Sequence, residues 1–235
     1  MAIVISSTPP RDYVLSFTVT EGHNRTALNQ EIRDLLDTSE LSEFQKGDEI
    51  QLWIENSEEN DAGLIASTGF TPYRDLVQLR CPLPVRESKL VTRRFELGVD
   101  EESFLRVNSR AFAWHPEQGD LDESTFAELK NEPWFDLEGF LLYELDNQLA
   151  GFCWTKIHLD NSPPLGEIYA IAIDPAYHGR GLGMPMTEAG LNYLHAKGIQ
   201  TGMLYVESDN IPALRTYEKI GFTHFLTNRA FRYRV

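Results

Sequence analysis

The segment Arg180-Gly181-Leu182-Gly183 combines residue types and spacing that indicate anion binding. It follows an apolar run, residues 166–173, that is typical of a strand, and it precedes residues 184–197, whose apolar spacing predicts a helix. Glycines at such a junction let the backbone turn tightly, and the unpaired N–H groups of the helix start point at the bound anion. The segment therefore predicts a site for a phosphorylated cofactor. A glycine-rich turn without a ligand is the alternative.

Glu167 and Tyr217 are the candidates for acid–base chemistry near this segment. Glu167 begins the strand that leads to the glycines, and its carboxylate can accept a proton from an amine. Tyr217 follows Asn210 by seven residues on a predicted helix, and its hydroxyl can donate a proton to a departing thiolate. The alternatives are a solvated carboxylate at a strand end and an aromatic ring packed in the core.

The elements that must position these groups are well punctuated from about residue 88 onward. Asp100 and Asp122 can cap two helices, and Asp146-Asn147 is the turn chemistry of an antiparallel hairpin. Asn210, followed by Pro212, begins a further helix. The predicted strands are residues 140–145, 149–158, 166–173, 203–207, 222–226 and 230–235. This order of elements is typical of an α/β (α+β) fold.

The composition argues against several classes of protein. The net charge of −15 opposes non-specific binding to nucleic acid, because such binding rests on clustered Lys and Arg. The six histidines lack metal-binding spacing, and Cys81 and Cys153 are too few and too far apart for a disulfide framework. We therefore expect no metal and two buried thiols. No run approaches the roughly 18 apolar residues of a membrane span, so we expect a cytoplasmic protein without membrane contact, and a monomer.

The N-terminal region matches part of the later sequence. An apolar run ends at Glu55 as another ends at Glu207, and each glutamate precedes a Gly-Phe pair by 14 residues. The first copy has Ile65 in the place of Tyr217 and has no glycine loop. We predict a partial, degenerate domain without a cofactor loop, followed by an active domain. The predicted boundaries are residues 1–82 and residues 88–235.

Two longer patterns point to a known superfamily. Residues 171–183 read Ile-Ala-Ile-Asp-Pro-x-x-His-Gly-Arg-Gly-Leu-Gly, and residues 210–222 read Asn-x-x-Ala-x-x-x-Tyr-x-x-x-Gly-Phe. Over residues 88–235 the chain thus resembles the GNAT acetyltransferases, although His178 stands where Gln or Arg is usual. The resemblance implies a mixed, mostly antiparallel sheet with helices on both faces, and acetyl-CoA as the acetyl donor. It places acetyl-CoA against Ile171, Ala172, Ile173, His178, Gly179, Arg180, Gly181, Leu182, Gly183, Met184, Asn210, Ala213 and Arg215. We expect the main-chain N–H of Ala172 to stabilise the oxyanion.

Five shorter segments, at residues 115–119, 134–136, 154–156, 166–169 and 204–210, look like the mycothiol synthase family within that superfamily. Those actinobacterial enzymes acetylate the cysteinyl amine of desacetylmycothiol (Cys-GlcN-Ins) in the last step of mycothiol biosynthesis. The family has tandem GNAT domains, of which the C-terminal one is active. The resemblance implies that Glu167 is the general base and Tyr217 the general acid. It implies substrate contacts at Glu117, Lys156, Glu167 and Tyr205.

Two other functions remain open on the sequence alone. The chain could be a GNAT enzyme that acts on another small-molecule amine or on a protein N-terminus. It could also be a module that binds acetyl-CoA without catalysis. The matches around residues 115–119 and 154–156 favour the first reading because they lie outside the general acetyl-CoA motif, and the presence of both Glu167 and Tyr217 favours an enzyme.

Overall fold

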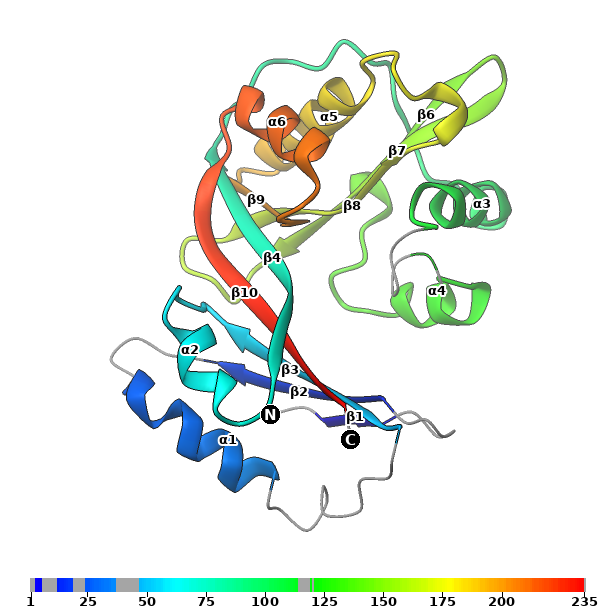
Figure 1. Ribbon diagram of the computed structural model, residues 1–235. Coiled ribbons are helices and arrows are strands. Elements are labelled where there is room, and N and C mark those ends of the chain that lie inside the picture. Colours follow the sequence, from blue (N-terminus) through cyan, green and yellow to red (C-terminus); the bar gives the residue numbers. More distant parts are fainter. Residues whose placement is uncertain are drawn as a thin grey trace. The chain divides into compact units, whose positions relative to one another are not determined.

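The computed structural model describes residues 3–5, 12–18, 24–36, 47–113, 119 and 121–234. The chain forms two compact units (Figure 1). Unit 1 takes the described residues of Met1–Gln78 and His224–Val235 together with Val206–Asn210. Unit 2 takes Leu79–Tyr205 and Ile211–Thr223. The division therefore differs from the predicted boundaries, because the last strand of the chain groups with the N-terminal residues.

Unit 1 is a sheet covered by two helices. Its strand order is β1-β2-β3-β10-β4, in which β2 and β3 are parallel and β10 is antiparallel to β3. The hydrophobic core lies between the sheet and the helices, with Ile32, Leu52 and Phe231 fully buried. The bounds are β1 Ile3–Ile5, β2 Asp12–Thr18, η1 Arg25–Ala27, α1 Leu28–Leu36, β3 Glu49–Glu55, α2 Asp61–Ala66, β4 Thr71–Pro82 and β10 Thr223–Arg234.

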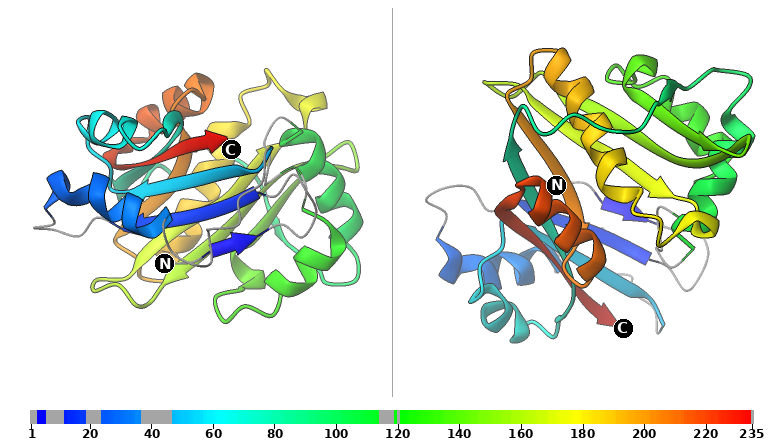
Figure 2. Two further views of the ribbon diagram at one scale, coloured as in Figure 1. Left: turned by 60° about the horizontal axis from the view of Figure 1, so that its bottom comes forward. Right: turned by 90° about the horizontal axis from the view of Figure 1, so that it is seen from above.

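Unit 2 is a mixed sheet with helices on both faces, as Figures 1 and 2 show. Its strand order is β4-β9-β8-β7-β6-β5, and β4 enters it with its last residues. The helices α3 and α4 lie on one face, and α5 and α6 lie on the other. The bounds are β5 Arg93–Arg94, α3 Glu101–Ala111, α4 Glu123–Leu129, η3 Leu137–Gly139, β6 Phe140–Leu145, β7 Gln148–His158, β8 Leu165–Ile173, η4 Pro175–Tyr177, α5 Gly183–Ala196, β9 Thr201–Glu207 and α6 Ile211–Ile220.

Aromatic rings form the core between α3, α4 and the sheet of unit 2. Phe104 of α3 and Phe126 of α4 are buried against Phe140, Phe152 and Trp154. The rings of Phe140 and Trp154 stack with their centroids 4.8 Å apart. Burying such rings contributes about 1.5–3 kcal/mol each, so this cluster fixes β6 to β8 as a rigid platform. Trp154 is a core residue.

The β6–β7 hairpin turns where the sequence predicts. Asp146 and Asn147 have φ angles of 54° and 59°, the left-handed conformation of a two-residue hairpin turn. Further along, the register between β7 and β8 shifts between Trp154 and Thr155. Such a bulge bends a strand and changes the direction of the side chains beyond it. It lies immediately before the positions that face Glu167.

The strands β8 and β9 part after a short parallel pairing. Gly166 pairs with Gly202 and Glu167 with Met203, and β8 then continues to Ile173 paired with β7 on its other side. Within the described residues, the β9-facing edge of β8 therefore has no ladder partner beyond Glu167. A gap between neighbouring strands exposes main-chain N–H and C=O groups that can bind an extended ligand.

The prediction of two strands at the end of the chain was wrong, because β10 runs without a break from Thr223 to Arg234. The polar residues in its middle resemble a turn in sequence. In the structure Arg229 binds the Asp75 carboxylate and Asn228 accepts from the main-chain N–H of Asn56, so these groups are satisfied without a turn.

Candidate active site

The glycine loop has the conformation that its sequence predicts. Gly179 and Gly181 have φ angles of +77° and +71°, which side chains with a Cβ rarely adopt. The loop leads directly into α5 at Gly183, whose first turn carries no acidic residue and no capping side chain. A Cβ at Gly181 or Gly183 would meet no atom within 4 Å, so the approach to the main chain is open. Anions bind such helix starts through main-chain N–H groups.

A cavity of about 400 Å³ in unit 2 opens onto this loop. Its lining combines the loop and the start of α5 with three cationic side chains, and no carboxylate belongs to it. Lys89 and Lys219 have neither an ion-pair nor a hydrogen-bond partner among the described residues. These cations give this cavity a local positive charge in a chain whose net charge is −15. The lining residues are Arg86, Lys89, Gly181, Gly183, Met184, Pro185, Thr216 and Lys219.

The segment that carries Arg86 and Lys89 is tied along α5. The guanidinium of Arg86 binds the buried Glu188 carboxylate at 2.8 and 3.0 Å. Ser88 donates its hydroxyl to the carbonyl of Pro185 at 2.6 Å, and its N–H binds the Asn192 side chain. These contacts hold Lys89 beside the helix start. The segment precedes the sequence motif, so no local pattern could have identified its cations.

Along the free edge of β8, the main-chain N–H groups of alternate residues point toward the gap. The N–H of Asp174 donates to the carbonyl of Ala150 on β7, and Ala172 pairs with Phe152 two positions earlier. Antiparallel alternation therefore turns the N–H of Ala172 toward β7 and the N–H groups of Ile171 and Ile173 toward the gap. The expected oxyanion donor, Ala172, does not fit this geometry.

His178 lies at the end of this edge. Its Nε2 is 2.9 Å from the carbonyl oxygen of Ile173, to which it can donate a hydrogen bond. The imidazole thus ties the first residue of the loop to the end of β8. His178, which departs from the superfamily pattern, therefore acts as a hydrogen-bond donor to the main chain. A Gln or Arg side chain can also donate such a bond.

Three of the predicted functional side chains share one face of the sheet in unit 2. Lys156 on β7 lies opposite Glu167 on β8, and Glu167 lies opposite Met203 on β9. Directly paired residues point to the same face, and so does Tyr205, two residues beyond Met203. Lys156, Glu167 and Tyr205 therefore lie on the same face of the sheet, and their contact with a substrate stays a prediction. Glu167 is only 8% exposed, whereas Tyr205 is 38% exposed.

Lys156 lies against two aromatic rings on this face. Its Nζ is 4.5 Å from the ring centroid of Trp134 and 5.6 Å from that of Tyr169. The negative faces of the rings attract the ammonium group and hold it over the sheet. Burial, with the nearby Glu167 and Glu132 carboxylates, raises the pKa of Tyr169 above its ordinary value. The rings form an apolar wall beside charged groups.

Tyr217 is buried on α6 and packs against Phe222 with ring centroids 5.7 Å apart. Burial raises its pKa well above the ordinary value, and electrostatic interaction with the Cys153 thiol adds to this shift. Cys153 is itself buried on β7 against Gly190 of α5. The phenol therefore lies on the α5 side of the sheet and stays protonated at neutral pH.

The remaining predicted residues are less well placed. Glu117 lies outside the described residues. Arg215 is exposed and does not line the cavity, whereas Thr216 and Lys219 of the same helix do. Asn210 belongs to unit 1. Among the described residues, no cluster of three His, Cys, Asp or Glu side chains could hold a metal ion. None of the helices in the described part of the chain has the length and hydropathy needed to traverse a lipid bilayer.

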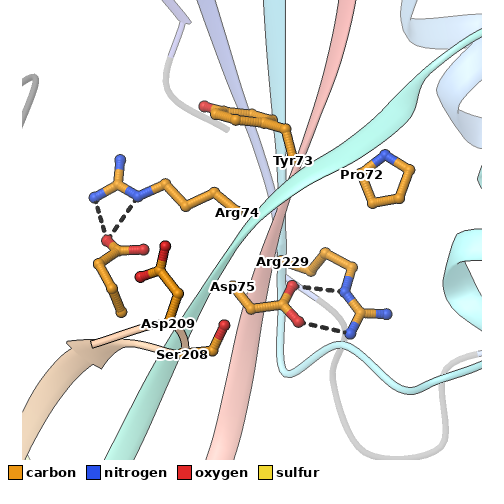
Figure 3. A pocket seen from close by; sticks show the side chains of 8 residues that line it. Pro72, Tyr73, Arg74, Asp75, Ser208, Asp209 and Arg229 are labelled. Carbon is orange, nitrogen blue, oxygen red and sulfur yellow. Dashed lines mark hydrogen bonds and ion pairs between the residues drawn. The ribbon is translucent and has the colours of Figure 1, made fainter. Parts of the chain in front are cut away.

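Unit 1 has a cavity of its own, of about 450 Å³ (Figure 3). Arg229 binds Asp75 through two hydrogen bonds of 2.7 and 2.8 Å, and Arg74 binds Glu207 at 2.6 Å. Figure 3 shows both guanidinium groups turned to these carboxylates. Because each arginine is already neutralised, this cavity lacks the free positive charge found beside the glycine loop.

The comparisons with known proteins agree with this architecture. The Acetyltransferase (GNAT) family model matches residues 104–222. A solved GCN5-related N-acetyltransferase from Sphaerobacter thermophilus has the same fold, with a TM-score of 0.76 and 17% identity over 99% of this chain and 76% of that one. A tandem GNAT protein from the clavulanic acid biosynthesis pathway superposes with a TM-score of 0.60 and 12% identity over 94% and 75% of the two chains. The chain belongs to the GNAT acetyltransferase family.

Within that family, curated proteins similar in sequence to this chain are mycothiol acetyltransferases. The protein of Acidimicrobium ferrooxidans is 45% identical over 74% of this chain and 59% of its own length. That of Catenulispora acidiphila is 42% identical over 80% and 63%. That of Kocuria rhizophila is 37% identical over 94% and 75%. The chain thus spans less than two thirds of the length of the first two relatives.

Proposed function

We propose that the chain transfers the acetyl group of acetyl-CoA to the cysteinyl α-amine of desacetylmycothiol and so forms mycothiol. The observation that carries this proposal is the parting of β8 from β9 directly after Glu167. It leaves an open main-chain edge that leads from a buried carboxylate to the glycine loop. The names of the similar proteins support the choice of acceptor. Because acetyl-CoA is a cytoplasmic metabolite, we place the reaction in the cytoplasm.

The residues present fit acetyl-CoA. The N–H groups at the start of α5 and the positive-φ glycines suit the diphosphate, and the cations Lys89 and Lys219 suit the remaining phosphate. The N–H of Ile173 suits a carbonyl oxygen of the pantetheine arm. Acetyl-CoA supplies an activated acyl group, and the protein supplies binding, orientation and proton transfer.

Three groups of the chain would act on the reacting atoms. Glu167 would accept a proton from the acceptor's ammonium group, directly or through a water molecule, because only a neutral amine attacks a carbonyl. The N–H of Ile171, in place of Ala172, would stabilise the negative charge that develops on the carbonyl oxygen. Tyr217 would donate its proton to the departing thiolate, and its raised pKa keeps that proton available.

The acceptor would lie on the face that carries Lys156, Glu167 and Tyr205. Desacetylmycothiol is a polyhydroxylated molecule, and such ligands need several polar groups set in an apolar wall. The ammonium group of Lys156 and the hydroxyl of Tyr205 supply polar contacts, and Trp134 supplies the wall. We retain Glu117 as a fourth contact on the family resemblance.

The test is an acetylation assay read by mass spectrometry. We expect one acetyl group to be added to desacetylmycothiol, with the thiol still reactive toward a thiol reagent, since the amine is acetylated. An aminoglycoside and a peptide with a free N-terminus serve as alternative acceptors. Acetylation of only those acceptors would reject the proposed substrate but keep the enzyme class. Binding of acetyl-CoA without transfer to any amine would favour a non-catalytic module.

A further inference from the structure

Glu167 has a partner that the sequence motifs do not include. The Nε2 atom of His158 on β7 is 2.7 Å from the Oε2 atom of Glu167 on β8. The two side chains are 22% and 10% exposed, so water screens the contact only in part. Within the described part of the chain, no other side chain hydrogen-bonds to this carboxylate.

The sheet register explains how the imidazole reaches the carboxylate. Lys156, not His158, lies directly opposite Glu167, but His158 is two residues further along the same strand and therefore points to the same face. The ammonium group of Lys156 is drawn over the rings of Trp134 and Tyr169. Because Lys156 is held over these rings, the side chain that contacts the Glu167 carboxylate is that of His158, which lies diagonally across the two strands.

We propose that His158 is a positioning residue for Glu167: its Nε2–H donates to Oε2, fixes the rotamer of the carboxylate and directs the lone pairs of Oε1 at the acceptor amine. A base that is itself held by a third group is the usual arrangement at such centres. The inference rests on the proposed role of Glu167 as the base.

The hydrogen bond also gives a donor to a carboxylate that is nearly buried. Burial removes most of the water that would otherwise bind such a group, so its loss of a donor is costly. Among the described residues, the other charged or hydroxyl-bearing groups on this face are Lys156 on β7, Tyr169 on β8, Tyr205 on β9 and Glu132 after α4. Removing the imidazole should therefore leave the position of the carboxylate poorly fixed.

The experiment compares His158→Leu with His158→Gln. Leucine removes the donor, whereas the amide nitrogen of glutamine can take the place of Nε2. We expect His158→Leu to lower kcat/KM by about 10- to 100-fold at neutral pH, the effect of leaving one nearly buried charged group unpaired. We expect its KM for acetyl-CoA to stay within about twofold, so that the loss falls on kcat. His158→Gln should recover most of the loss in kcat.

Equal impairment of the two variants, or a leucine variant with the kcat of the wild type, would overturn the proposal. Nitrogen-15 NMR of the histidines supplies a readout that does not depend on activity. We expect the His158 resonance, assigned by its loss in His158→Gln, to show the Nε2–H tautomer, and the Nδ1–H tautomer would count against the proposal. His224→Leu, an exposed histidine of unit 1, is the matched control and should match the wild type. If the wild type acetylates no amine, the proposed function fails while the NMR result still tests the pairing.

Discussion

Glu167 and Tyr217 come from different elements of unit 2. Glu167 lies in the last residue pair that joins β8 to β9, and Tyr217 lies on α6, which follows β9. Glu167 points to the face of the sheet that holds Trp134, whereas Tyr217 lies near Cys153 on the α5 side. The proposed base and the proposed acid thus lie on different sides of the sheet, and each would serve a separate proton transfer.

Glu167→Gln should lower kcat by about 100-fold or more at neutral pH, because the amide cannot take the proton of the acceptor amine. The affinity for acetyl-CoA should change little, since the carboxylate lies outside the cavity beside the loop. Steady-state kinetics and calorimetry measure the two quantities. Unchanged turnover would reject Glu167 as the base.

Tyr217→Phe should lower kcat while the melting temperature stays within a few degrees, because the ring is kept. The raised pKa of Tyr217 means that the phenol keeps its proton beyond its ordinary pKa of about 10. The ratio of wild-type to variant rates should therefore be constant from about pH 7 to about pH 9.5. A ratio that falls toward one in the alkaline range would show that the phenol titrates there, contrary to the account.

At the level of single residues, the sequence predicts those whose role depends on local conformation. The residue types at Gly181 and Asp146 favour the positive φ angles that both adopt. Glu167 lies at the start of a strand that leads to a recognisable motif. His158 and Lys89 could not be found in this way. Their proposed roles depend on the bulge at Tyr169 of β8 and on a segment tied along α5, and these are tertiary features.

The junction of the loop and α5 can be tested with two neighbouring glycines. Gly183→Ala should leave the free energy of unfolding unchanged or slightly raise it, because the position is helical and open. The new methyl group should nevertheless weaken acetyl-CoA binding by about 10-fold, the loss of one hydrogen bond to a charged group. Gly181→Ala, at a φ of +71°, should lower stability by about 1–2 kcal/mol as well. Chemical denaturation and calorimetry separate the effects, and intact binding in both variants would exclude this loop as the anion site.

The segment tied to α5 should give selectivity for the phosphate on the ribose of acetyl-CoA. Replacing both Lys89 and Lys219 by Gln should reduce the preference for acetyl-CoA over acetyl-dephospho-CoA by about fivefold, since each exposed ion pair contributes up to about 1 kcal/mol. Lys197→Gln is the control, because its Nζ lies over the Tyr193 ring and not in the cavity lining. The ratio of the two kcat/KM values is the measurement. An unchanged ratio in the double variant would show that these lysines do not contact that phosphate.

At the level of elements, helix and strand types follow from periodicity and caps, whereas strand continuity does not. The helices after Asp100 and Asp122 begin where the capping residues predict. The middle of β10 resembles a loop because it is polar, but its side chains find partners such as Asp75 and the main chain of Asn56. A polar stretch can remain in a strand when neighbours far away in sequence satisfy it.

For the whole molecule, the prediction of a repeat gains support from corresponding elements. β3 ends at Glu55 and β9 at Glu207, and each is followed by a helix and a long strand. Gly69 and Gly221, which precede β4 and β10, both have positive φ angles. These correspondences support a degenerate first copy, which stays a prediction, as does the monomeric state. The sequence could not predict that β10 groups with the N-terminal residues, because the neighbours of a strand in a sheet are set by tertiary structure.

The central claim is that acetyl-CoA binds unit 2 along the free edge of β8 and at the glycine loop. Hydrogen exchange, followed by mass spectrometry with and without acetyl-CoA, tests it directly. The account predicts slower exchange at residues 171–173 and 178–186 in the presence of the ligand, and no change around the ion-paired cavity at residues 72–75 and 207–209. Protection confined to that second cavity, or no protection in the loop, would contradict it.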